Sequence, residues 1–179
     1  TEDTALNLID IVASDVDSAN ITVTLTLSDT AAGSLNTGTS GAVTSTFAAG
    51  VWSASGAIAD VNALLAGVTF TPTLNFNSTF TIATSVSDGV APAITGIKAM
   101  TGTPVNDAPT ALNLSAAETY TEDTALNLID IVASDVDGGS ITATLTLSNV
   151  AAGSLTTATS GAVTSTFAGG VWTASGAIA

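Results

Sequence analysis

The stretch Ile21-Thr-Val-Thr-Leu-Thr-Leu27 alternates apolar side chains with threonine, and Ile141-Thr-Ala-Thr-Leu-Thr-Leu147 repeats the pattern. A period of two places the apolar side chains on one face of a β-strand and the hydroxyls on the other face. Threonine and valine suit such a half-buried, pleated surface. Both stretches are therefore predicted to be strands with one buried and one hydrated face.

The same criteria predict further strands along the first two thirds of the chain. These are Ala5–Ile11, Val43–Phe47, Val51–Ala57, Val68–Thr71, Phe80–Val86 and Ile94–Thr101. Ala48–Gly50 and Ala168–Gly170 are typical of hairpin turns, with Trp52 and Trp172 as core anchors just beyond them. Asp60–Gly67 predicts a short helix with Asp60 as its N-cap and Gly67 at its stop. About seven short strands separated by turns indicate an all-β fold of the β-sandwich type.

The chain repeats itself. Residues 1–59 and 121–179 differ at only ten of fifty-nine positions, which gives a period of 120 residues. A unit of this length is large enough to bury a core of its own. We therefore expect tandem domains in an elongated array: residues 1–104 form one repeat that lacks its first strand, and residues 105–179 form the truncated start of the next. The segment Thr103–Pro109 is expected to be a stiff linker, because its prolines restrict the backbone.

Charge excludes several function classes. The chain has fifteen acidic residues and one basic residue, Lys98, and it has no histidine and no cysteine. Such a chain repels nucleic-acid backbones and anionic lipid surfaces, and no apolar run approaches the ~20 residues of a membrane-spanning helix. Serine and threonine are abundant, yet no histidine, cysteine or neighbouring lysine is present to activate them. The chain is not expected to be an enzyme.

Most of the acids occur at strand ends rather than on strand faces. The positions are Glu2, Asp3, Asp15, Asp17, Asp88, Asp107, Glu122, Asp123, Asp135 and Asp137. One interpretation is that they satisfy local backbone donors in turns. The other is that they bind calcium, which takes six to eight oxygen ligands, because crowded carboxylates repel one another unless a cation joins them. The clustering of several acidic positions near one junction favours calcium.

Four short motifs, in this order along a repeat, resemble those of cadherin domains. They are Tyr120-Thr-Glu-Asp-Thr-Ala-Leu126, Ala133-Ser-Asp-Val-Asp-Gly-Gly-Ser140, Val86-Ser-Asp-Gly89 and Pro104-Val-Asn-Asp-Ala-Pro109. The whole unit is similar to the cadherin-like tandem repeats of very large bacterial surface adhesins of the RTX and biofilm type. The resemblance implies a Greek-key β-sandwich related to cadherin and immunoglobulin domains, with Ca²⁺ bound between successive domains.

The resemblance also implies how the ligands divide among junctions. For the junction inside this chain it assigns Glu2, Asp3, Asn106, Asp107, Asp135 and Asp137. Asp15, Asp17 and Asp88 belong to a preceding junction, and Glu122 and Asp123 belong to a following one. The chain departs from the family at Leu74–Thr79, where cadherins carry an acidic Asp-Arg-Glu and this chain has no carboxylate. Fewer or weaker ions per junction are therefore expected.

Together, these inferences predict that the chain is part of a calcium-rigidified extender, which holds a terminal binding domain away from a cell surface. Extracellular modules bind calcium at ~10⁻⁴–10⁻³ M, which implies a location outside the cell. Neighbouring repeats of the same chain would be the partners. One alternative is a structural subunit of a surface filament, sheath or S-layer, in which copies also associate laterally into fibres. Another is a glycan-binding module that uses threonine and tryptophan.

Overall fold

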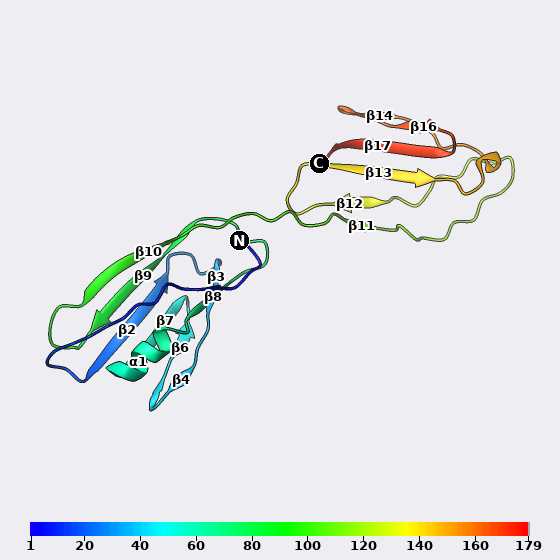
Figure 1. Cartoon of the computed structure of the whole chain (residues 1–179). Coiled ribbons are helices and arrows are strands. Elements are labelled where there is room, and N and C mark those ends of the chain that lie inside the picture. The colour runs from blue at the N-terminus through cyan, green and yellow to red at the C-terminus, as the bar shows by residue number, and fades with distance from the viewer. Residues whose placement is uncertain (179) are drawn as a thin grey trace. The chain divides into compact units, whose positions relative to one another are not determined.

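The structure is a computed structural model that describes residues 1–178; Ala179, the last residue of the second predicted repeat, lies outside them. The chain folds as two compact units, which comprise residues 1–105 and 106–179 (Figure 1). Both units are built from antiparallel sheets, so the chain is all-β in class, as the sequence predicted. Within the described residues, α1 (Ile58–Leu65) is the sole α-helix.

Unit 1 contains a five-stranded antiparallel sheet. Its strands, in spatial order, are β10 (Ile94–Met100), β9 (Phe80–Ser87), β2 (Asn20–Leu27), β7 (Val51–Ala57) and β6 (Thr46–Ala48). The alternation of β2 works as predicted: Ile21, Val23, Leu25 and Leu27 are buried, while Thr22 and Thr26 are exposed. The apolar face of this sheet therefore forms one wall of the core.

A second, three-stranded sheet in unit 1 consists of β1 (Leu6–Asn7), β8 (Thr69–Pro72) and β3 (Gly33–Leu35). A two-stranded ribbon of β4 (Thr39–Ser40) and β5 (Val43–Thr44) lies against α1 and β7. Leu35 and Phe70 from the small sheet join Val23, Trp52 and Ile82 from the large sheet in a single buried cluster. The two sheets thus share one hydrophobic core.

The hairpin between β6 and β7 was predicted correctly. Ala49 and Gly50 both adopt positive φ angles, 48° and 77°, which is the conformation of a tight two-residue hairpin turn. A Cβ at Gly50 would lie 2.6 Å from Cγ2 of Thr30, so a side chain there would also collide with the preceding loop. Trp52 follows this turn, is 1% exposed, and donates its indole N–H to the carbonyl of Asn36 at 3.0 Å.

Three local predictions need correction. The expected strand Ala5–Ile11 is paired only at Leu6–Asn7, because β8 begins at Thr69, opposite Asn7, and the residues before it belong to α1, which ends at Leu65, and to the turn that follows. The expected strand Val43–Phe47 is interrupted at Ser45, whose hydroxyl and N–H bond to the backbone of Gly38. Asp60 is not the N-cap of α1: the helix begins directly after β7, with Ala57 at the cap position and no side-chain cap. Asp60 lies in the first turn and accepts a hydrogen bond from Ser40 Oγ at 3.3 Å.

Unit 2 repeats part of this arrangement. Its three-stranded sheet consists of β13 (Ser140–Thr146), β17 (Val171–Ala177) and β16 (Thr166–Ala168), which match β2, β7 and β6 in sequence. The ribbon of β14 (Thr159–Ser160) and β15 (Val163–Thr164) matches that of β4 and β5. A short 3₁₀ helix, η1 (Val150–Ala152), precedes it. One pair has no counterpart in unit 1: β11 (Thr110–Leu112) pairs with β12 (Val132–Ser134).

Candidate metal site at the strand ends

Glu2 is the most deeply buried of the sequence-predicted ligands, at 2% exposure. Its N–H donates to the carbonyl of Thr103 at 3.0 Å, and its Oε1 accepts the N–H of Val105 at 2.6 Å. The other carboxyl oxygen, Oε2, is buried and has no hydrogen-bond partner among residues 1–178. Burying an ionised carboxylate is costly unless an opposite charge or further donors compensate it. The surroundings of Glu2 therefore favour a cation beside Oε2.

Asp3 connects this carboxylate to the loop at residues 73–79. Asp3 adopts a left-handed backbone with φ of 58°, and its Oδ1 accepts the N–H of Asn75 at 2.8 Å. The amide oxygen of Asn75 is also buried without a hydrogen-bond partner within the described chain. Sequence reasoning missed Asn75, because it considered only the absence of carboxylates from this loop. Calcium also takes amide oxygens, so an asparagine here was the available signal.

The loop at 73–79 is held in place from two sides. Phe76 packs edge-on against Phe80 at 5.9 Å, and Phe80 contacts Phe70 at 5.0 Å between ring centroids. On the other side, a Cβ at Gly102 would lie 2.3 Å from the carbonyl oxygen of Asn77, so only glycine permits this approach. The loop is therefore fixed close to the segment that contacts Glu2.

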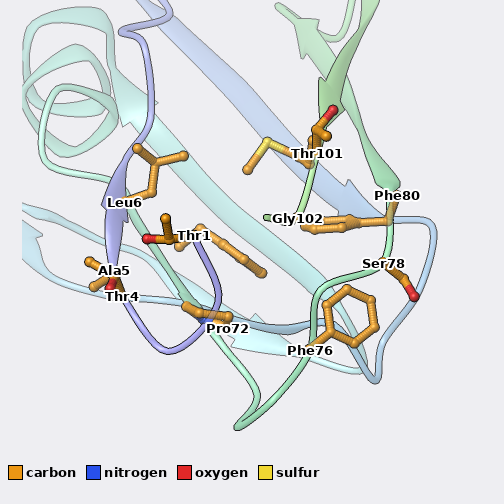
Figure 2. Close-up of a pocket in the computed structure, with 12 residues that line it drawn as sticks. Thr1, Thr4, Ala5, Leu6, Pro72, Phe76, Ser78, Phe80, Thr101 and Gly102 are labelled. Atoms are coloured by element: carbon orange, nitrogen blue, oxygen red, sulfur yellow. The ribbon is translucent and has the colours of Figure 1, made fainter. Parts of the chain in front are cut away.

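A small hollow lies beside these aromatic rings. It has a volume of about 110 Å³, and Figure 2 shows Thr1 and Leu6 on one side of it and Phe76, Phe80 and Gly102 on the other. Pockets for small molecules usually measure about 300–1,000 Å³. This hollow is thus too small for a sugar ring with its hydration, and it contains no carboxylate.

Asp15, Asp17 and Asp88 come together in a second group in unit 1. Asp15 Oδ1 accepts the N–H groups of Asp17 at 2.9 Å and Ser18 at 2.6 Å, while Ser18 Oγ donates to Asp88 Oδ2 at 3.4 Å. The backbone N–H groups of Val90 and Ala91 bond to Asp88 and hold the pKa of its carboxyl below its usual value. These contacts place Ser18, next to the Asp15-Val-Asp17 stretch, beside Asp88.

Asp107, Asp135 and Asp137 are neighbours in unit 2. The N–H of Asp107 donates to Asp137 Oδ2 at 2.6 Å, and the N–H of Asp137 donates to Asp135 Oδ1 at 2.9 Å. Asn106 donates its side-chain amide to the carbonyl of Asp107 at 2.7 Å. Gly138, next in the loop, has φ of 71° and donates its N–H to the carbonyl of Asp135. Backbone donors thus orient the carboxylates of this loop.

Glu122 and Asp123 are exposed. Asp123 adopts the same left-handed conformation as Asp3, with φ of 60°, so the local turn forms in both repeats. The six residues assigned to the internal junction fall into two groups, Glu2 with Asp3 in unit 1 and the other four in unit 2. Among residues 1–178, no group of three or more Asp, Glu, His and Cys is arranged to hold a metal ion.

Within the described part of the chain, no helix combines the length and the apolar character needed to cross a membrane. Comparisons of the chain with protein-family models, with curated proteins and with solved structures return no match.

Proposed function

We propose that the chain is a calcium-rigidified extender from an extracellular bacterial adhesin, built from cadherin-like β-sandwich repeats of Greek-key type. The observation that carries this proposal is the environment of Glu2. A carboxylate 2% exposed, with one oxygen bonded to Val105 and the other without a partner in residues 1–178, needs a compensating cation. The net charge of −14 makes calcium a more suitable partner than any side chain of this protein.

In unit 1, the proposed oxygen ligands for calcium are Glu2 Oε2, the carboxylate of Asp3 and the amide oxygen of Asn75. In unit 2, the carboxylates of Asp107, Asp135 and Asp137 and the side chain of Asn106 supply oxygen ligands of the same hard type. Asp15, Asp17 and Asp88, like Glu122 and Asp123, serve neighbouring junctions of the array. Because affinities of such modules are ~10⁻⁴–10⁻³ M, the ion is bound outside the cell and lost inside it.

The β-sandwich itself is supported by the shared core of unit 1. The five-stranded and three-stranded sheets contribute to one cluster of buried residues, which is the arrangement of two sheets packed face to face. Compact domains of this kind, joined by a short proline-containing segment, suit the role of a spacer better than that of an enzyme.

A calorimetric titration with calcium chloride tests the proposal, with Glu2→Gln and Glu118→Gln as a matched pair, since each carboxylate accepts a backbone N–H that glutamine can still bond. Glutamine at position 2 retains an oxygen for the N–H of Val105 but removes the negative charge. Glu2→Gln is expected to weaken calcium binding and to reduce the rise in melting temperature that calcium causes. Glu118→Gln leaves both unchanged, because Glu118 is exposed and is not one of the proposed ligands. Equal melting temperatures with calcium and with chelator would refute the proposal.

A structural subunit of a filament, sheath or S-layer is the second candidate, and β10 favours it. This strand forms an edge of the five-stranded sheet and exposes Ile94 and Ile97 at 75% and 74%. Exposed apolar residues on an edge strand promote pairing between chains. Concentration-dependent sedimentation separates this candidate from an isolated rod. The glycan-binding alternative would rest on Trp172, which is half-buried, because Trp52, Phe70 and Phe80 are buried.

A further inference from the structure

The peptide bond between Asp137 and Gly138 lies in the loop between β12 and β13. Asp137 is exposed, and Gly138 has a positive φ of 71°. The counterpart of Asp137 in unit 1 is Asp17, which is also exposed although residues 60–105 are present there. The exposure of this position is therefore a property of the loop itself. An aspartate followed by glycine permits a backbone reaction, because a residue without Cβ leaves its nitrogen accessible to the preceding carboxyl group.

The reaction is an isomerisation of the backbone through a ring. The nitrogen of Gly138 bonds to Cγ of Asp137, and the N–H proton, one carboxyl oxygen and a proton from solvent leave as water, which closes a five-membered succinimide. Water then adds to one of the two ring carbonyls. Opening at Cγ restores aspartate, whereas opening at the former backbone carbonyl gives isoaspartate, in which the chain runs through Cγ. Mass and charge are unchanged, and the backbone gains one methylene group.

The attacking nitrogen is held differently in the two repeats. In unit 1 the residue after Asp17 is Ser18, whose N–H donates to Oδ1 of Asp15 at 2.6 Å. In unit 2 the N–H of Gly138 donates to the carbonyl of Asp135 at 3.3 Å, which is longer than the usual range of about 2.7–3.2 Å. Both contacts lie within the loop. The nitrogen of Gly138 is therefore less restrained than that of Ser18.

The chain contains a second Asp-Gly pair, Asp88–Gly89, which provides an internal comparison. Oδ1 of Asp88 accepts the N–H groups of Val90 and Ala91, each at 3.0 Å. The N–H of Gly89 donates to Oγ of Ser87, also at 3.0 Å. Ring closure at this pair would have to break hydrogen bonds of ordinary length on both the carboxylate and the nitrogen. The folded structure therefore protects Asp88 from the reaction.

We propose that Asp137 is a site of spontaneous isomerisation to isoaspartate, through attack by the nitrogen of Gly138. The Asp137 carboxylate is bonded to one backbone donor, the N–H of Asp107 at 2.6 Å, and it faces the less restrained of the two glycine nitrogens. Lengthening the backbone by one methylene group displaces this carboxylate and breaks its bond to Asp107. The loop between β12 and β13 then loses its connection to the segment at Asp107, so the second repeat ages at this position.

The proposal does not depend on calcium, so its test incubates the full chain in chelator at neutral pH. The solvent is water enriched in heavy oxygen, which labels each residue that has passed through the ring. Mass spectrometry with electron-transfer fragmentation then distinguishes aspartate from isoaspartate at each position. Isoaspartate is expected to accumulate at Asp137 at least severalfold faster than at Asp88 and to stay at background at Asp17.

Two variants and one change of solvent separate the causes. Gly138→Ser gives unit 2 the residue that unit 1 has, and it is expected to slow isomerisation at Asp137 at least severalfold. Gly169→Ala, which introduces the unit 1 residue in a distant hairpin, leaves the rate unchanged. In concentrated urea, Asp88 and Asp137 are expected to react at similar rates, because the protecting hydrogen bonds are lost.

Three results would overturn the proposal. The first is a level of isoaspartate at Asp137 no higher than at Asp17 in the folded chain. The second is equal rates at Asp88 and Asp137 in the folded chain. The third is a difference between these two residues that persists unchanged in urea, because the folded contacts would then not be its cause.

Discussion

Unit 1 and unit 2 share a nearly identical stretch of 59 residues, yet the same side chains have different environments. Leu8 is 6% exposed, whereas its counterpart Leu128 is 39% exposed. Trp52 is fully buried, while Trp172 is only half-buried and lines a cavity of about 850 Å³ with Leu126, Leu128 and Leu145. In unit 1 this space is filled by residues from α1, β8 and β9, including Val61, Phe70 and Ile82. Strands β2, β6 and β7 and the β4–β5 ribbon therefore have counterparts in unit 2, whereas β1 and β3, which pair with β8, form in unit 1 alone, and burial depends on residues 58–105.

The largest expected difference between the units concerns the two tryptophans. Trp52→Ala removes a buried ring and is expected to cost unit 1 about 3–5 kcal/mol. Trp172→Ala costs unit 2 clearly less, because the ring already contacts solvent. Urea unfolding of each variant, followed by circular dichroism, measures the two losses. Equal losses would contradict the conclusion that burial distinguishes the units.

The next largest change in stability is expected at a position where the two repeats differ in sequence. Val23, which is fully buried, corresponds to Ala143 in unit 2. Val23→Ala is expected to destabilise unit 1 by about 2 kcal/mol, through lost burial and the cavity that remains. The reverse change, Ala143→Val, has little effect because position 143 is only half-buried. Each change is measured in a chain whose other tryptophan is replaced by phenylalanine, so that fluorescence reports a single unit.

Ser45 and Ser165 make the same hydrogen bond in the two units, so the same substitution is expected to have a similar effect in each unit. Each serine is buried and accepts a hydrogen bond from a backbone N–H seven residues earlier, Gly38 at 2.9 Å and Ala158 at 2.8 Å. Ser45→Ala and Ser165→Ala are each expected to cost about 1 kcal/mol. Hydrogen exchange of the N–H groups of Gly38 and Ala158 detects the loss locally. A large effect in one unit only would show that the ribbon depends on the rest of the core.

The smallest effect concerns acid stability and Asp88. Because its pKa is lowered by the N–H groups of Val90 and Ala91, the ionised carboxyl stabilises unit 1 above its ordinary pKa near 3.8. That contribution is lost as pH falls through the lower pKa of the folded state. Asp88→Asn is expected to reduce the acid dependence of the unit 1 melting temperature below about pH 4. An unchanged acid dependence would argue against these hydrogen bonds.

Prediction from sequence succeeded where a long pattern was present and failed where contacts decided the outcome. Val51–Ala57 was predicted to the residue, and β2 and β9 to within one residue at each end, because seven or eight alternating positions define them. Strands of two or three residues, such as β3, β4 and β11, are too short to show a period. The helix cap was misplaced, because α1 continues directly from β7 and needs no capping side chain at Asp60.

The candidate site shows the same contrast between local patterns, which the sequence reveals, and tertiary contacts, which it does not. The Asp15-Val-Asp17 and Asp135-Val-Asp137 loops were recognised from sequence, since their carboxylates bond to N–H groups within the same loop. The burial of Glu2 was not predictable, because it requires Val105, more than a hundred positions away. Asn75 was missed because only the absence of carboxylates from its loop was considered, although its contact with Asp3 also joins distant parts of the chain. The contacts of candidate ligands within one loop can be predicted from a pattern, whereas the tertiary contacts of Glu2 cannot.

Lys98, the only basic side chain, donates to the carbonyl of Ile9 at 2.8 Å. The sole basic side chain is therefore bonded within unit 1, and it offsets little of the net charge of −14. Two copies of the chain approaching side by side repel each other over roughly the Debye length, which is about 10 Å at 0.1 M salt and 30 Å at 0.01 M. Any bundling of copies through the apolar edge of β10 should thus be governed by ionic strength, with dispersed chains in fresh water and association in brine.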